Sequence, residues 1–172
     1  MSFYQLSVVQ MSTMLRNLDG QLDKVVAFAE AKDISPDSFV GFRLAPDMRP
    51  LAFQVQAACD TAKFTAGRLT GLEAPKHEDD ETTIVQLKQR IAVTLEWLSS
   101  VDESHFAGAA EREVRLSFLP GKGAKGDDYL REMAIPNFYF HVTTAYALMR
   151  LAGVDLGKRD FITTLTLHDV DA

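Results

Sequence analysis

Apolar residues recur at alternating spacings of three and four over the first thirty residues of the chain. This spacing is typical of an amphipathic helix that buries one face in a bundle. The positions that carry it are Val8, Met11, Leu15, Leu18, Leu22, Val25 and Ala29. The sequence therefore predicts a long first helix.

Three later segments show the same helical spacing. The second helix is expected to begin near Pro50 and to stop at Gly71, with small residues at its buried positions. The third is expected over residues 84–98 and the fourth over residues 136–152. Between these two, residues 114–119 alternate as a half-buried strand does. A lone strand cannot build a sheet domain, so we expect an all-α four-helix bundle with a short strand or hairpin excursion between helices three and four.

Composition and charge narrow the class of protein. The 172 residues are 47% hydrophobic and 24% charged, which suits a single folded domain over residues 1–172. A net charge of -6 argues against nucleic acid as a partner. The single cysteine, Cys59, suits a reducing compartment and an inert core thiol. Because the chain shows neither a signal peptide nor an apolar run that would span a bilayer, we expect a cytoplasmic protein without a membrane partner.

Two polar stretches resemble ligand-binding motifs but favour simpler interpretations. Residues 121–126 match the dinucleotide pattern G-x-G-x-x-G, yet the chain lacks the parallel sheet that this motif needs, so a surface turn is expected. Residues 78–81 are acidic and are expected to stabilise the start of the third helix, with Asp80 as its cap. His77, beside them, is expected to be a solvated loop residue.

The fourth helix carries the candidate site. Asn137, His141 and Thr144 share one face with Leu148 and Leu151. A buried imidazole must be hydrogen-bonded, protonated or bound to metal, so an inward His141 is either part of a site or part of a polar network that fixes helix register.

Residues of the second helix are expected to meet this face. Gln56 and Asp60 lie four apart and are the candidates to meet Asn137 and His141 in the bundle interior. The pocket candidates are therefore Asn137, His141, Gln56, Asp60 and Thr144, and no catalytic residue is predicted.

Three separated segments, at residues 43–51, 136–146 and 153–158, resemble the signatures of a bacterial family of unknown function. That family belongs to the DinB and YfiT-like superfamily of proposed metalloenzymes. The resemblance extends from Phe3 to Phe161. It implies a four-helix bundle with a long excursion before the last helix, and often a homodimer.

In the wider superfamily, a divalent metal, often nickel or zinc, is held by one histidine on the second helix and a pair four residues apart on the fourth. His141 matches one member of the pair, but Asn137 and Ala145 occupy the two positions four residues away, and no histidine lies near Gln56. Neutral amides are poor ligands for such metals. The resemblance therefore implies a degenerate site with His141 as its remaining metal ligand, or one rebuilt with water and either Asp60 or Asp47.

Two functional hypotheses follow from this pattern. The first is a bundle protein without a cofactor, whose pocket binds a small molecule or whose role is structural. The second is an enzyme of the thiol transferase or hydrolase type that uses a nickel or zinc ion held by His141 and carboxylates of the second helix.

Overall fold

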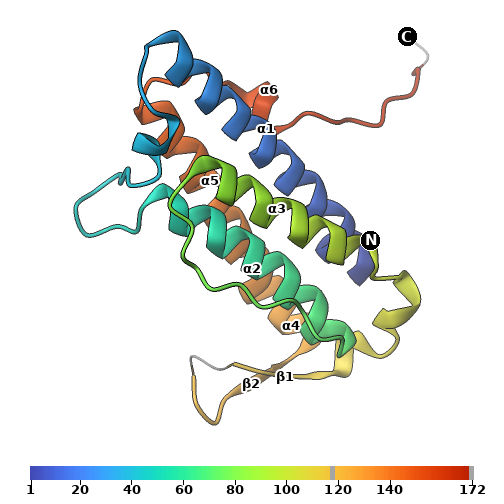
Figure 1. Ribbon diagram of the computed structural model, residues 1–172. Helices are drawn as coiled ribbons and strands as arrows, with labels where there is room; N and C mark the ends of the chain where they lie inside the picture. Colours follow the sequence, from blue (N-terminus) through green and yellow to red (C-terminus); the bar gives the residue numbers. More distant parts are fainter. Residues whose placement is uncertain (117–118, 171–172) are drawn as a thin grey trace.

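The computed structural model describes residues 1–116 and 119–170, and four long helices dominate this part of the chain (Figure 1). They are α1 (Gln10–Ala31), α2 (Leu51–Thr70), α3 (Ile84–Ser99) and α5 (Ile135–Leu151). A small two-stranded hairpin lies between α3 and α5 in the sequence. The predicted all-α bundle with a hairpin excursion is confirmed.

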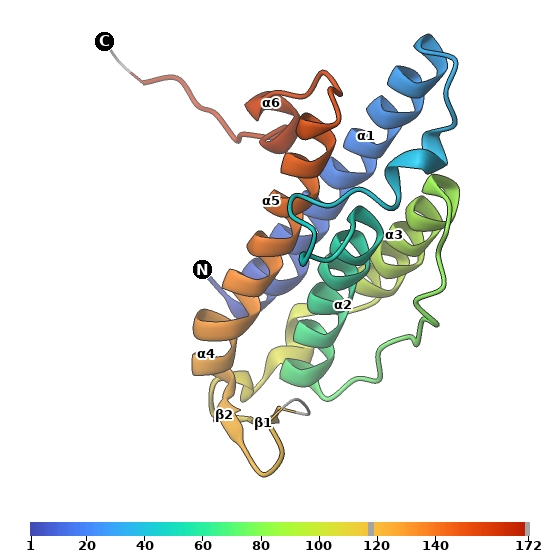
Figure 2. The same cartoon turned by 90° about the vertical axis from the view of Figure 1, so that its left-hand side faces the viewer.

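The four helices surround one apolar core. Helix α2 packs against both α3 and α5, and α1 packs against the same two helices from the opposite side (Figure 2). Each of the seven apolar positions that predicted α1 is buried, as are Leu51, Val55 and Leu69 of α2. The small residues Ala58 and Ala62 are also fully buried, which permits close packing on α2.

The helix ends follow from local sequence. Helix α2 ends at Gly71, whose left-handed φ of 85° lets its amide bond to the carbonyl of Gly67. Helix α3 begins after Thr83, whose hydroxyl accepts from the amide of Gln86 while the Gln86 side chain returns to the Thr83 amide. The prediction that Asp80 caps this helix is wrong, because Thr83 and Gln86 have the spacing of a capping box and Asp80 lies before it.

The strands of the excursion before α5 are shorter than predicted. Strand β1 (Glu113–Arg115) pairs antiparallel with β2 (Gly123–Lys125), and residues 117–118 of the predicted strand lie outside the described residues. The G-x-G-x-x-G segment forms the turn, β2 and the start of α4 (Gly126–Asp128). A π-helical turn, Tyr129–Ala134, then continues directly into α5.

Short helical turns fill the remaining connections. The C-terminal α6 (Lys158–Phe161) returns to α1, where Lys24 pairs with Asp160 at 2.7 Å and Asn17 donates to the Phe161 carbonyl. The other turns are π-helical Gln5–Val9 and the 3-10 turns Pro36–Phe39, Glu103–Phe106 and Ala109–Glu111. No helix in residues 1–116 or 119–170 is long and apolar enough to cross a membrane.

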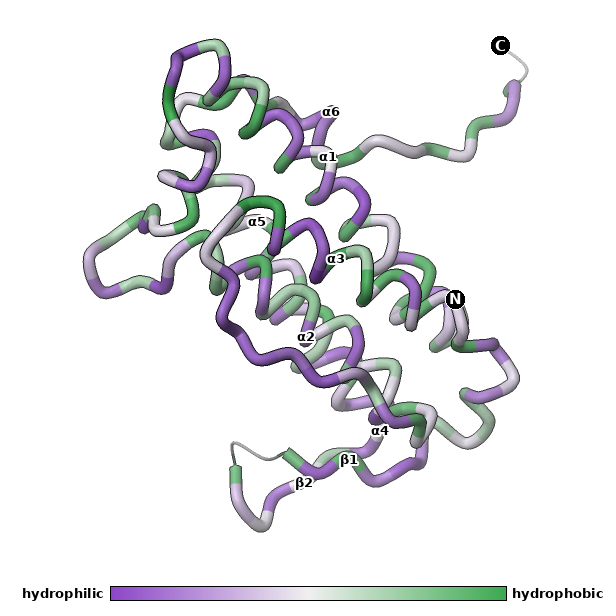
Figure 3. The backbone as a smooth tube through the Cα atoms, in the orientation of Figure 1, coloured by the Kyte–Doolittle hydropathy of each residue, from purple (hydrophilic) through white to green (hydrophobic). Residues whose placement is uncertain are grey.

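The connection between α2 and α3, residues 71–83, positions part of the site. It is strongly hydrophilic and runs back along α2 to the start of α3 (Figures 1 and 3). Because the segment has few apolar side chains to bury, its attachment to the bundle must come from polar contacts.

Candidate functional site

A pocket of about 270 Å³ opens between α2, α5 and the α2–α3 connection. Its walls combine three aromatic side chains with a small set of polar groups. It is lined by Phe53, Gln56, Ala57, Asp60, Thr61, Phe64, Arg68, Asp79, Tyr129, Met133, Asn137 and His141.

The pocket brings four of the five candidate residues together. Asn137 and His141 line it from α5, and Gln56 and Asp60 line it from α2. Thr144 does not line it: this residue is buried one turn further along α5, where its hydroxyl donates to the Phe140 carbonyl at 2.6 Å.

His141 is held by Gln54, a residue that the sequence pattern did not single out. Nδ1 of His141 lies 2.8 Å from Oε1 of Gln54, and Nε2 of Gln54 donates to the Arg49 carbonyl at 3.1 Å. Because a carbonyl can only accept, this second bond fixes the orientation of the Gln54 amide and turns its oxygen toward the imidazole. Nδ1 of His141 therefore carries a hydrogen.

The free lone pair of the His141 ring lies on Nε2. Burial lowers the pKa of this histidine, so the ring is neutral near pH 7 and has one nitrogen with a free lone pair. Since Nδ1 is protonated, that nitrogen is Nε2, which has no hydrogen-bond partner among the described residues. The aromatic rings of Phe53 and Phe140 pack edge-on against the imidazole at centroid distances of 5.9 and 5.2 Å. His141 thus contributes an oriented hydrogen-bond acceptor to the pocket wall.

Asn137 also donates a hydrogen bond to a residue of α2. Its Nδ2 lies 2.7 Å from Oγ1 of Thr61, and that hydroxyl donates to the Ala57 carbonyl. Because the hydroxyl hydrogen is used on Ala57, Thr61 must accept from Asn137. The oxygen of the Asn137 amide has no partner in the described part of the chain, so this residue also offers an acceptor.

The contacts of α2 with α5 differ from those expected. His141 bonds to Gln54 and Asn137 bonds to Thr61, whereas Gln56 and Asp60 were expected to meet them. Gln54 and Thr61 lie seven residues apart on α2, which places them on one face of the helix. The seven-residue spacing of Gln54 and Thr61 is visible in the sequence. The four-residue spacing of Gln56 and Asp60 on the same helix suggested a different pair of partners.

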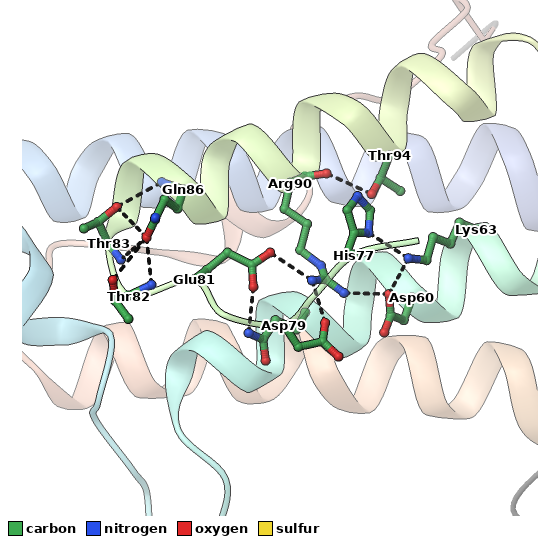
Figure 4. A network of polar contacts seen from close by, with 11 residues as sticks. Asp60, Lys63, His77, Asp79, Glu81, Thr82, Thr83, Gln86, Arg90 and Thr94 are labelled. Carbon is green, nitrogen blue, oxygen red and sulfur yellow. Dashed lines mark hydrogen bonds and ion pairs between the residues drawn. The ribbon is translucent and has the colours of Figure 1, made fainter. Parts of the chain in front are cut away.

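Asp60 and Gln56 instead join an ion network centred on Arg90 of α3 (Figure 4). The Arg90 side chain is 1% exposed and lies 2.6 Å from Asp60, 2.6 Å from Asp79 and 2.9 Å from Glu81. Gln56 donates to Glu81 at 2.8 Å. Burial raises the pKa of Glu81, but the hydrogen bonds from Arg90 and Gln56 outweigh it and hold that pKa below its usual value.

A second buried cation completes the network. Lys63 of α2 is 1% exposed, and its Nζ lies 2.8 Å from Oδ1 of Asp60 and 2.7 Å from Nδ1 of His77. An ammonium group can only donate, so Nδ1 of His77 accepts and the hydrogen of the neutral ring lies on Nε2. Nε2 is buried and has no partner in residues 1–116 and 119–170. The expectation that His77 is solvated is wrong, because Lys63 holds it against the bundle.

The side chains that line the pocket are not a suitable set of ligands for a divalent metal. Oδ1 of Asp60 already lies between two buried cations, Asn137 is a neutral amide, and His141 is the one imidazole on the pocket wall. Asp47 is exposed and does not line the pocket. Within the described ranges, no three His, Cys, Asp or Glu side chains form a group that could hold a metal ion.

Cys59 is not a nucleophile in this structure. It is fully buried in α2, and burial raises the pKa of its thiol to about 12. A thiol with this pKa is protonated near neutral pH and has little nucleophilic thiolate. Cys59 is therefore an inert core thiol, as the sequence indicated.

The bundle, its hairpin excursion and the pocket between α2 and α5 define a DinB-like helical protein. The chain belongs to the family of the domain of unknown function DUF1993, which matches residues 3–162. It is similar to a DinB family member protein from Shewanella denitrificans, whose crystal structure matches with a TM-score of 0.93 and 46% sequence identity. That match covers 97% of this chain and 95% of the other. None of the curated proteins matches the chain.

The neutral state of His77 predicts a pH dependence of stability. Burial, followed by the charges of Lys63 and Arg90, lowers the pKa of His77 in the folded protein. The unfolded chain therefore takes up a proton at about pH 6.5 while the folded protein does not, so stability is complete above this pH and falls below it. Replacing His77 by Gln, which keeps an acceptor for Lys63, should reduce this loss.

Urea unfolding at intervals from about pH 8 to about pH 5 measures the effect. His168→Gln is the matched control because His168 is exposed in the C-terminal tail. The wild type and the control should lose stability together, with a smaller loss in His77→Gln. Identical pH dependence in all three proteins would contradict the Lys63–His77 contact.

Proposed function

We propose that this protein binds a small organic molecule in the pocket between α2 and α5 without a metal cofactor. The observation that carries the proposal is the tautomer of His141, which Gln54 and the Arg49 carbonyl fix with the lone pair on Nε2. An imidazole oriented in this way, at the wall of an apolar pocket, is suited to accept a hydrogen bond from a ligand.

The pocket walls indicate the chemistry of the ligand. Phe53, Phe64 and Met133 offer apolar surface, while Nε2 of His141 and the amide oxygen of Asn137 present acceptors that have no partner among the described residues. The cavity volume lies just below the range of roughly 300–1,000 Å³ that is usual for ligand pockets. These features favour a compact molecule with an apolar body and an O–H or N–H group.

We also infer that the superfamily metal site is degenerate in this chain. The alternative, a metal-dependent thiol transferase or hydrolase, needs ligands that supplement His141. Asp60 is the nearest carboxylate candidate on α2, and releasing it would leave Arg90 and Lys63 buried with one fewer counter-charge. Arg90 would keep Asp79 and Glu81, but Lys63 would lose its carboxylate partner, and leaving a buried charge uncompensated is costly.

Phenol and anisole form a matched pair of probes for the proposed acceptor. Both have a compact aromatic body, but only phenol has a hydroxyl donor. Phenol should bind more tightly than anisole to the wild type, because its hydroxyl can donate to Nε2 of His141. In His141→Phe, which keeps an aromatic ring but removes this acceptor, the preference for phenol should become smaller.

Chemical-shift titration of backbone amides follows both probes, and His168→Gln serves as the control because His168 is far along the exposed tail. The control should keep the preference for phenol. The proposal fails if phenol shifts no pocket residue below the concentration that unfolds the protein. It also fails if the preference for phenol is as large in His141→Phe as in the wild type.

We propose further that two copies of the chain associate through the outer face of α5. Phe140 is 56% exposed and Leu151 is 65% exposed, and half-buried Ala147 lies between them at helical spacing. The outer face of α5 thus exposes apolar side chains beside the polar residues Thr143 and Arg150, and exposed apolar surface often marks an interface. The homodimers implied by the family resemblance support the same interpretation.

Sedimentation velocity tests this association. Phe140→Glu should shift the protein from dimer to monomer because it places a charge in the apolar contact. Val85→Glu is the matched control, since Val85 is 74% exposed on α3 and away from this face. A wild type that sediments as a monomer, or two variants that behave alike, would contradict the proposed dimer face.

We infer a reducing compartment such as the cytoplasm for this protein. Cys59 supports the inference, because it is a free thiol buried in the core. Chains from oxidising compartments more often contain paired cysteines.

A further inference from the structure

A second cavity, of about 490 Å³, lies between the C-terminal end of α2 and strand β1. Three arginines line it: Arg68 from the last turn of α2, and Arg112 and Arg115 from the start of the hairpin. One carboxylate, Glu113, is also on the wall. This cavity is separate from the proposed ligand pocket, although Arg68 lines both.

The charges at this cavity are unbalanced. Guanidinium groups stay protonated at all physiological pH values, so the three arginines exceed Glu113 by two positive charges. None of the three forms an ion pair with a carboxylate among the described residues, whereas Arg90 has three acidic partners. This gathering of positive charge occurs in a chain with a net charge of -6.

The end of α2 does not offset this excess. Arginines near a helix C-terminus interact favourably with its free carbonyls, and this contact explains part of the arrangement. The macrodipole, however, amounts to roughly half a negative charge at that end. Against an excess of two positive charges, this half charge leaves most of the positive charge at the cavity unbalanced.

Contacts with neutral groups hold two of the arginines in place. Nη1 of Arg68 donates to the Tyr129 hydroxyl at 2.9 Å, and its guanidinium lies 5.4 Å from the ring centroid of Phe64. The Arg112 guanidinium lies over Gly71, where a Cβ would come within 3.3 Å of Nη1. These contacts orient the side chains without neutralising them.

Arg112 also has an unsatisfied donor. Its Nε is buried and has no hydrogen-bond partner in the described part of the chain. Buried polar groups without a partner are rare in folded proteins and call for an explanation. The Arg112 guanidinium has no carboxylate partner among the described residues, so its N–H donors are available to an acidic ligand.

We propose that this cavity binds a small anion of the phosphate or carboxylate class. Arg112 and Arg115 are its ligands, and Arg68 adds positive charge from the α2 side. The fork of N–H donors in a guanidinium matches the oxygens of both anions and can bind them in a bidentate manner. Because Arg68 also lines the pocket of His141, an anion bound here can interact electrostatically with a molecule in that pocket.

Titration of the full chain with sodium phosphate and, separately, with sodium acetate tests the site. Ionic strength is held constant with sodium chloride, and binding is followed by calorimetry and by the side-chain Nε resonances of arginine. At least one anion should bind saturably with one equivalent per chain. Tighter binding of phosphate assigns the site to phosphoryl groups, and tighter binding of acetate assigns it to carboxylates.

Three substitutions separate a built site from general charge attraction. Arg112→Gln and Arg115→Gln should each weaken binding by about tenfold or more, since each removes a charge-assisted pair of hydrogen bonds. Arg131→Gln removes the same charge from an exposed arginine that pairs with Asp128, and it should leave the affinity unchanged. Because Arg115 is exposed, its variant keeps the test valid if Arg112→Gln does not fold.

Two results would overturn the anion site. One is the lack of saturable binding for both phosphate and acetate. The other is equal weakening by Arg131→Gln and Arg115→Gln, which would reduce the effect to net charge. The phenol experiment does not depend on either result, because it concerns His141 and a different cavity.

Discussion

The buried guanidinium of Arg90 is the group on which the arrangement of the site depends. It lies on α3 and pairs with Asp60 of α2 and with Asp79 and Glu81 of the connection between these helices. A buried charge is tolerated only when it is paired and hydrogen-bonded, so the two helices and the connection must keep their relative positions. The hydrophilic connection is thereby attached to the bundle without a large apolar contact, and Asp79 is placed at the rim of the pocket.

The same network determines which groups the pocket can offer to a ligand. Asp60 shares one oxygen between Arg90 and Lys63, and the donors of Asn137 and His141 bond to Thr61 and Gln54. Among the described residues, Nε2 of His141 and the amide oxygen of Asn137 remain as neutral acceptors without a partner. A site with this character suits hydrogen bonding to an organic molecule better than coordination of a cation.

Periodicity predicted the helices because every position of an apolar stripe meets the same core. It also grouped Asn137 and His141 on one face of α5, and both residues line the same pocket as Gln56 and Asp60. It did not predict the partners, because a long side chain such as Gln54 can reach across the bundle from a neighbouring face of α2.

The apolar spacing in the sequence also could not predict contacts between distant segments. The pairing of Lys63 with His77, and of Arg90 with residues of the α2–α3 connection, joins groups whose spacing has no helical or strand period. The π-helical geometry of residues 129–134 has no signature in the spacing of apolar residues. The acidic run at residues 78–81 was expected to interact with the dipole of α3, whereas two of its members, Asp79 and Glu81, form ion pairs with Arg90 of that helix.

Calorimetric titration with Zn²⁺ and Ni²⁺ is the most direct test of the claim that the pocket is not a metal site. The experiment uses protein without a histidine tag and compares the wild type with His141→Ala. Our account predicts that neither metal binds stoichiometrically to the wild type and that the variant gives the same weak, nonspecific heat. One equivalent of tightly bound metal in the wild type, lost in His141→Ala, would contradict it.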